Sequence, residues 1–154
     1  MPIDVGATAP DFALKDQHGQ TVSLSDFRGR QSVLLVFYPW SFSRICTGEL
    51  CEIRDALPTL QGEDTAVVAV SCDAMFTQRV YAEQEGLAFP VLSDFWPHGA
   101  VASAYGVFDD GLGAALRGTF LVDKAGTVRW RVVNGVGEAR DLHDYQRVLS
   151  GSST

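Results

Sequence analysis

Residues 33 to 46 read Val33-Leu34-Leu35-Val36-Phe37-Tyr38-Pro39-Trp40-Ser41-Phe42-Ser43-Arg44-Ile45-Cys46. The first six are apolar and rich in strand formers, a pattern typical of a central β-strand that is covered on both faces. Pro39 ends this strand. Apolar residues then recur at helical spacing from about Cys46 to Leu57, and we expect Pro58 to stop that helix. The stretch therefore predicts a buried strand that leads through a short loop into a helix, with Cys46 in its first turn.

The rest of the chain continues this alternation of strands and helices. A short hairpin around His18-Gly19 comes first, and a second hairpin turns at Lys124-Ala125-Gly126. Further strands are expected over 66–71, 89–92, 119–122 and 128–133, and further helices over 77–85, 98–105 and 140–149. This order predicts an α/β protein with a thioredoxin-like fold, in which helices flank a central mixed sheet and the first hairpin is an N-terminal extension. We expect a single domain over residues 1–154.

The composition limits the classes of function. The chain has 154 residues and a net charge of −7. Nucleic-acid binding is not expected, since it needs a basic patch and the arginines are scattered among acids. These scattered arginines include Arg28, Arg30, Arg129, Arg131 and Arg140. No apolar run is long enough to span a membrane. The start has no basic segment followed by an apolar one, so we expect no signal peptide and a cytoplasmic protein.

The three cysteines, Cys46, Cys51 and Cys72, point to reactive or simply buried thiols. An odd number of cysteines in a reducing compartment argues against a structural disulfide framework. The cysteines and histidines lack the spacings of a zinc site, and the absence of C-x-x-C argues against a thioredoxin-type disulfide reductase. Cys72 ends a predicted buried strand, and we interpret it as a core residue.

Cys46 occupies a position that suits a nucleophile. Free N–H groups and the positive end of the helix dipole stabilise a thiolate in a first helical turn. Cys46 also extends the apolar stripe of its helix, so its sulfur is expected to be sheltered by the core. The spacing alone fits two interpretations equally, an activated thiolate or a small buried hydrophobic residue.

Pro39, Ser43 and Cys46 match the peroxiredoxin motif Pro-x-x-x-Thr/Ser-x-x-Cys, and the chain resembles that family over nearly its whole length. Glu49 matches a glutamate that often follows the motif, and Arg117 matches the family's active-site arginine. Segment 6–12 also resembles a peroxiredoxin opening. Segments 93–101 and 104–108 resemble the AhpE-type subfamily in particular.

The resemblance implies a thiol-dependent peroxidase that reduces hydrogen peroxide, organic hydroperoxides or peroxynitrite. Cys46 would attack the peroxide and become a sulfenic acid, which requires no metal or organic cofactor. Ser43 would hydrogen-bond the thiolate and the peroxide, and Arg117 would supply fixed positive charge. Pro39 would shield the sulfur, and Glu49 would orient Arg117. The alternative is a non-enzymatic thioredoxin-fold redox sensor or holdase, which would not need this pocket.

Cys51 departs from the AhpE-type pattern. Cys46-x-x-x-x-Cys51 resembles instead the bacterioferritin-comigratory (Q-type) peroxiredoxins, in which the second cysteine resolves the sulfenic acid. We expect Cys51 to be an exposed thiol on the polar side of the helix, so a disulfide would require unwinding. The alternative to this disulfide is that a thioredoxin-like, mycoredoxin-like or low-molecular-weight thiol reduces the Cys46 sulfenic acid directly. The family resemblance also implies a homodimer, and Phe95-Trp96-Pro97 fits either a partner contact or a capped core loop.

Overall fold

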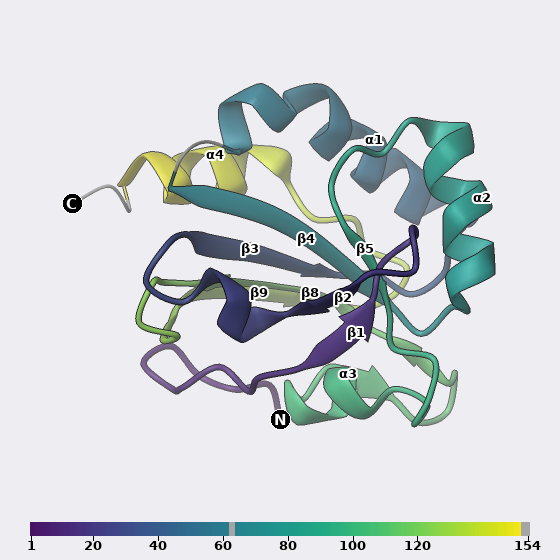
Figure 1. Ribbon diagram of the computed structural model, residues 1–154, viewed down its shortest axis with the longest axis horizontal. Helices are drawn as coiled ribbons and strands as arrows, with labels where there is room; N and C mark the ends of the chain where they lie inside the picture. Colours follow the sequence, from purple (N-terminus) through teal and green to yellow (C-terminus); the bar gives the residue numbers. More distant parts are fainter. Residues whose placement is uncertain (62–63, 152–154) are drawn as a thin grey trace.

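A seven-stranded mixed sheet forms the centre of the protein in the computed structural model, which describes residues 1–61 and 64–151 (Figure 1). The strand order is β2-β1-β5-β4-β3-β8-β9, and β6 and β7 form a separate two-stranded ribbon. The strands are β1 (Ala13–Lys15), β2 (Thr21–Ser23), β3 (Ser32–Phe37), β4 (Thr65–Ser71), β5 (Val91–Ser93), β6 (Phe108–Asp109), β7 (Ala114–Ala115), β8 (Arg117–Val122) and β9 (Val128–Asn134). The helices are η1 (Leu24–Phe27), α1 (Arg44–Leu60), α2 (Met75–Glu85), α3 (Ala100–Ala104) and α4 (Leu142–Gly151).

The pairing of the central strands brings distant parts of the chain to one edge of the sheet. β3 runs parallel to β4 and antiparallel to β8. Because Val36 pairs with Thr119 in the antiparallel ladder, the start of β8 lies beside the end of β3. Arg117, the first residue of β8, therefore reaches the edge at which the chain leaves β3 and enters α1.

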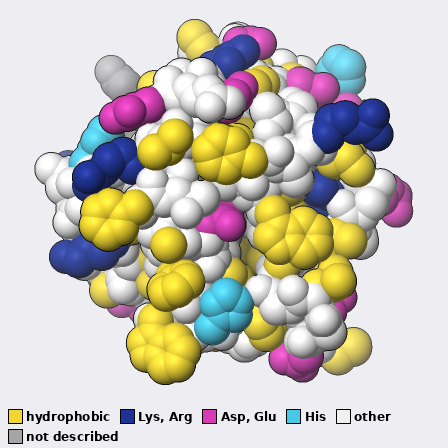
Figure 2. All heavy atoms as spheres, turned by 90° about the vertical axis from the view of Figure 1, so that its right-hand side faces the viewer, with side chains coloured by type: hydrophobic (Ala, Val, Ile, Leu, Met, Phe, Trp, Pro, Cys, Tyr) yellow, Lys and Arg dark blue, Asp and Glu magenta, His cyan; other side chains and the backbone are white. Residues whose placement is uncertain are grey.

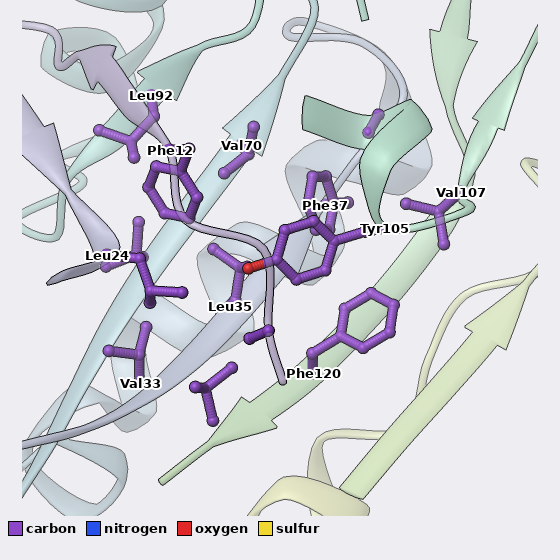
Figure 3. Packing of buried hydrophobic residues seen from close by; sticks show 14 of the residues in the cluster. Phe12, Leu24, Val33, Leu35, Phe37, Val70, Leu92, Tyr105, Val107 and Phe120 are labelled. Carbon is purple, nitrogen blue, oxygen red and sulfur yellow. The ribbon is translucent and has the colours of Figure 1, made fainter. Parts of the chain in front are cut away.

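β3 is buried on both of its faces, as its apolar run predicted. Leu34 and Val36 face the layer that contains α1, α2 and α4. Leu35 and Phe37 face the opposite layer, which contains α3 and the N-terminal segment. Figure 3 shows this second layer, in which the rings of Phe37, Tyr105 and Phe120 lie close together. Their ring centroids are 5.2–6.0 Å apart, within the range of favourable aromatic contacts.

The predicted order of elements is confirmed, and several details differ from the prediction. Pro58 does not stop the helix, because it lies in the last turn of α1 and the chain completes that turn around it. The Gln61 N–H still donates to the Leu57 carbonyl. The predicted helix over 98–105 is shorter, since Gly99 adopts the left-handed conformation just before α3. The short ribbon of β6 and β7 and the 3-10 turn η1 were not predicted.

No helix within residues 1–61 and 64–151 is both long enough and apolar enough to cross a membrane.

Candidate active site

Cys46 lies in the first turn of α1, and its side chain is fully buried. The helix begins directly after Ser43, which has an extended backbone and accepts the Thr47 N–H through its carbonyl at 2.9 Å. Leu50 and Ile53 continue the same stripe into the core between α1 and the sheet. The sequence therefore places the sulfur where the helix dipole is positive and where the core excludes water.

Arg117 contacts the sulfur from the far side of the fold. Its Nη1 lies 3.1 Å from Cys46 Sγ, and only 2% of the residue is exposed. The Arg117 Nε–H donates to the Val136 carbonyl at 2.8 Å, which fixes the plane of the guanidinium. Because the guanidinium is buried and held through its Nε–H, it presents a positive charge to the sulfur in a fixed position.

Glu49 joins Arg117 to a second buried arginine. Arg117 Nη1 donates to Glu49 Oε1 at 2.7 Å, and Arg140 donates to the same carboxylate from its Nη2 at 2.9 Å and its Nε at 3.0 Å. Burial raises the pKa of the Glu49 carboxyl, but hydrogen bonds and charge from Arg140, with the charge of Arg117, outweigh burial and leave that pKa below its usual range. The carboxylate therefore stays ionised and holds Arg117 in place.

Arg140 was named above only among the scattered arginines, and its place in this site was not predicted. It is 6% exposed, and its Nη1 donates to the carbonyls of Phe37 and Gly118. No local sequence pattern predicted the burial of Arg140, because its neighbours Ala139 and Asp141 are exposed. Its burial follows from long-range contacts, because the folded chain brings Arg140 to the end of β3 and the start of β8.

Ser43 and Pro39 lie on the loop that leads into α1. The Ser43 hydroxyl donates to the Trp40 carbonyl at 2.8 Å, so its hydrogen is directed into the loop and its lone pairs are left to accept. Pro39 is buried at the end of β3. Between them, Phe42 has φ 70°, a conformation that costs energy in any residue with a side chain.

The other two cysteines have environments unlike that of Cys46. Cys51 is half-buried against α2, so the expectation of an exposed thiol is wrong, although α1 is intact and the thiols are separate. Its Sγ lies 3.5 Å from Glu85 Oε1. Burial, and then this hydrogen bond, raise the pKa of Cys51. Burial, and then the charges of Asp94 and Asp73, raise the pKa of Cys72 to about 12, which makes it an inert core thiol.

The aromatic loop after β5 is on the surface. Trp96 is 81% exposed and Phe95 50%, so the interpretation as a core loop is wrong. Figure 2 shows the face at the right of Figure 1, where large hydrophobic side chains gather around a few charged groups. Across the described residues the exposed large hydrophobic side chains are Met1, Val5, Trp40, Phe42, Phe76, Val80, Phe95, Trp96 and Leu112.

Comparison with known proteins gives consistent matches. A model of the AhpC/TSA family matches residues 5–131. The chain is 51% identical over 139 residues to alkyl hydroperoxide reductase E of Mycobacterium tuberculosis, which covers 90% of this chain and 91% of that protein. It is 34% identical to a putative peroxiredoxin of Synechocystis, with 94% and 76% covered. The structure of peroxidoxin BcpB from M. tuberculosis superposes with a TM-score of 0.87 at 29% identity over 99% of both chains. A reduced 2-Cys peroxiredoxin of Plasmodium vivax superposes with a TM-score of 0.86 at 26% identity, over 97% of this chain and 81% of that one.

Proposed function

This chain belongs to the AhpC/TSA family as an AhpE-type peroxiredoxin, a thiol-dependent peroxidase, and from that premise we propose that Cys46 is the sulfur that attacks the peroxide. The Cys46 thiolate donates an electron pair to one peroxide oxygen, the O–O bond breaks, and the leaving oxygen takes up a proton as water or an alcohol. The sulfur is oxidised to a sulfenic acid, and a thiol then reduces it.

The contact between Arg117 Nη1 and Cys46 Sγ carries this assignment. Arg117 thereby places a fixed cation 3.1 Å from the sulfur that is to attack the peroxide. The positive charge of the same guanidinium would also stabilise the negative charge that develops on the oxygens as the O–O bond stretches, and fixed groups of this kind are a major source of rate enhancement. Glu49 orients Arg117 and takes no part in bond making. A redox sensor or holdase would have no use for this arrangement, and that alternative is not favoured.

Ser43 and Pro39 are assigned to the peroxide pocket. Because the Ser43 hydroxyl donates to the Trp40 carbonyl, we assign it the role of acceptor for the proton of a bound hydroperoxide. Pro39 narrows the entrance beside the sulfur and keeps water from replacing the peroxide. The pocket requires no metal or organic cofactor, because the electrons come from the sulfur.

We assign Cys51 as the thiol that resolves the sulfenic acid. Its thiol would attack Cys46 sulfur and form a disulfide, and the hydroxyl would leave as water. Residues five apart on a helix have Cα atoms ~8–9 Å apart, beyond the ~7 Å limit for a disulfide, so the start of α1 has to unwind. An external thioredoxin-like, mycoredoxin-like or low-molecular-weight thiol would then reduce the disulfide in the cytoplasm. In the alternative route that thiol reduces Cys46 directly.

Mass spectrometry after one equivalent of hydrogen peroxide tests both assignments. The wild type is expected to lose two hydrogens as the Cys46–Cys51 disulfide forms, and Cys51→Ala is expected to gain one oxygen. Cys46→Ser is expected to leave the peroxide unconsumed, whereas Cys72→Ser consumes it as the wild type does. Turnover by Cys46→Ser would contradict the nucleophile. A stable sulfenic acid in the wild type would show that Cys51 is a bystander.

A further inference from the structure

The loop between β3 and α1 contains a backbone conformation that needs support. Among the described residues, Phe42 is the one residue other than glycine with a positive φ, at 70°. Residues in such conformations persist where the surrounding structure holds them, and they cluster at active sites. Phe42 stands four residues before Cys46, in the segment that we assign to the peroxide pocket.

Three contacts hold this part of the loop. The Ser41 N–H donates to Asp73 Oδ2 at 2.8 Å, and the Ser41 hydroxyl lies 3.0 Å from the Tyr38 hydroxyl. The Phe42 ring lies 4.9 Å from the Tyr81 ring, between centroids. Of these three contacts, the hydrogen bond to Asp73 is the one that involves the loop backbone, at the residue directly before Phe42. It also joins the loop to the segment between β4 and α2.

The Asp73 carboxylate is itself fixed in direction. The Gln78 amide donates to Ser71 Oγ at 2.9 Å and to the Leu92 carbonyl at 2.8 Å. Because Ser71 Oγ accepts that hydrogen, its own hydrogen is free to donate to Asp73 Oδ2, at 2.6 Å. Gln78 and Ser71 are fully buried, so water does not compete for these bonds.

The backbone of Asp73 is held as well. Its carbonyl accepts the Ser93 hydroxyl at 2.6 Å, which ties the segment to β5. Ser71 of β4 and Ser93 of β5 thus fix Asp73, and the Asp73 carboxylate in turn fixes the Ser41 N–H. Within the described part of the chain, Asp73 makes no hydrogen bond or ion pair with Cys46, Arg117 or Glu49, whose positions come from α1, β8 and the segment before α4.

We propose that Asp73 is a positioning residue for the peroxide step: by holding the Ser41 N–H it sets the shape of the loop that carries Pro39 and Ser43. The inference rests on Cys46 being the nucleophile. Under this proposal two elements determine different properties of the site. Arg117 supplies the charge at the sulfur, and the loop determines how the peroxide fits. A misplacement of about 1 Å in such a pocket costs ~10²-fold in rate.

The test compares two reactions of Cys46 in Asp73→Ala, Asp73→Asn and the wild type. The first is the second-order rate of oxidation by hydrogen peroxide, followed by acid quench and mass spectrometry. The second is alkylation by iodoacetamide, which needs the thiolate but no peroxide pocket. Asp73→Ala is expected to slow oxidation by ~10–10²-fold while alkylation stays within about threefold. Asp73→Asn keeps an acceptor oxygen for Ser41 and is expected to restore most of the oxidation rate.

Two control variants accompany them. Asp110→Ala removes an acid from the exposed β6–β7 turn and is expected to leave both rates unchanged. Ser71→Ala removes the donor that directs the carboxylate, and it is expected to slow oxidation more than alkylation; it decides the question if Asp73→Ala does not fold. An oxidation rate unchanged in Asp73→Ala overturns the proposal, as does an equal loss in both reactions. Oxidation that survives in Cys46→Ser contradicts the nucleophile instead, and so distinguishes the two failures.

Discussion

At the scale of single residues, the site depends on charges that are buried together. Arg117, Glu49 and Arg140 are each at most 7% exposed, and the carboxylate bridges the two guanidinium groups. Such a group is stabilising only when every partner is present, because removal of one leaves an uncompensated charge in the core. Each member is therefore expected to affect both the reaction and the fold, and substitutions have to be chosen to separate the two effects.

Arg117→Lys is expected to slow the oxidation of Cys46 while the protein stays folded. Lysine keeps the charge but lacks the planar set of donors that contacts Cys46, Glu49 and the Val136 carbonyl at once. Loss of a fixed donor typically costs ~10²–10³ in rate. Stopped-flow measurement of the second-order rate checks this, with Arg129→Lys, at an exposed position of β9, as the control. Equal oxidation rates for Arg117→Lys and Arg129→Lys would show that the reaction does not need the planar set of donors at Arg117.

Glu85→Gln is expected to make Cys51 react faster with iodoacetamide at neutral pH. Burial raises the pKa of Cys51, and the hydrogen bond to Glu85 raises it further. Removal of the negative charge lowers that pKa, so more thiolate is present at a given pH and the alkylation profile moves to lower pH. Peptide mass spectrometry in a Cys46→Ser background measures this. Glu83→Gln, an exposed acid on the same helix, is the control, and an identical profile for both would refute the effect.

At the scale of elements, the sequence was informative wherever a pattern is local. The apolar run of β3, the helix after Pro39 and the left-handed Gly86 at the end of α2 are all visible as short-range signals. Cys46, Ser43 and Pro39 follow from the same segment. What the sequence could not predict depends on long-range contacts, such as the burial of Arg140, the Glu85 contact of Cys51 and the hold of Asp73 on Ser41. No spacing rule relates residues that are 91, 34 or 32 positions apart.

The stability of the first turns of α1 is expected to set the rate of disulfide formation. Gly48 is exposed in the second turn, and an added Cβ would meet no atom within 4 Å. Gly48→Ala is therefore expected to stabilise the helix by ~1 kcal/mol and raise the melting temperature by ~2–4 °C. Because Cys46 and Cys51 meet only after this segment unwinds, disulfide formation is expected to slow about fivefold.

Rapid-quench mass spectrometry separates formation of the sulfenic acid from formation of the disulfide in Gly48→Ala. The first step is expected to keep the wild-type rate, which serves as the internal control. If the disulfide forms at the wild-type rate in a protein with the higher melting temperature, then unwinding of α1 is not part of the resolving step.

At the scale of the whole molecule, one loop exposes two large aromatic side chains next to each other in the sequence. Trp96 and Phe95 protrude from the loop after β5, and Figure 2 shows hydrophobic side chains gathered on that side of the molecule. We expect two copies to associate through this loop. Light scattering at micromolar concentration is expected to give twice the 16.7 kDa mass of the chain.

Trp96→Glu is expected to shift this dimer to the monomer, because it places a charge in the contact. Val5→Glu changes an exposed apolar residue of the N-terminal segment in the same way and is expected to leave the dimer intact. A wild type that scatters as a single chain would contradict the assembly, and a dimer that survives Trp96→Glu would move the interface to another face.

The buried charges around Cys46 also link the redox state of one sulfur to the stability of the fold. With Cys46 as the thiolate that the proposed reaction requires, two guanidinium groups, one carboxylate and that thiolate sum to zero, whereas a neutral sulfenic acid leaves a net positive charge in the same place. If oxidation makes the protein easier to unfold, the thermodynamic cycle requires that folding makes Cys46 harder to oxidise at equilibrium. We expect oxidised Cys51→Ala to melt below its reduced form in calorimetry, and equal melting temperatures would disprove this link. The native fold would therefore increase the rate at which Cys46 is oxidised and decrease the equilibrium driving force for that oxidation.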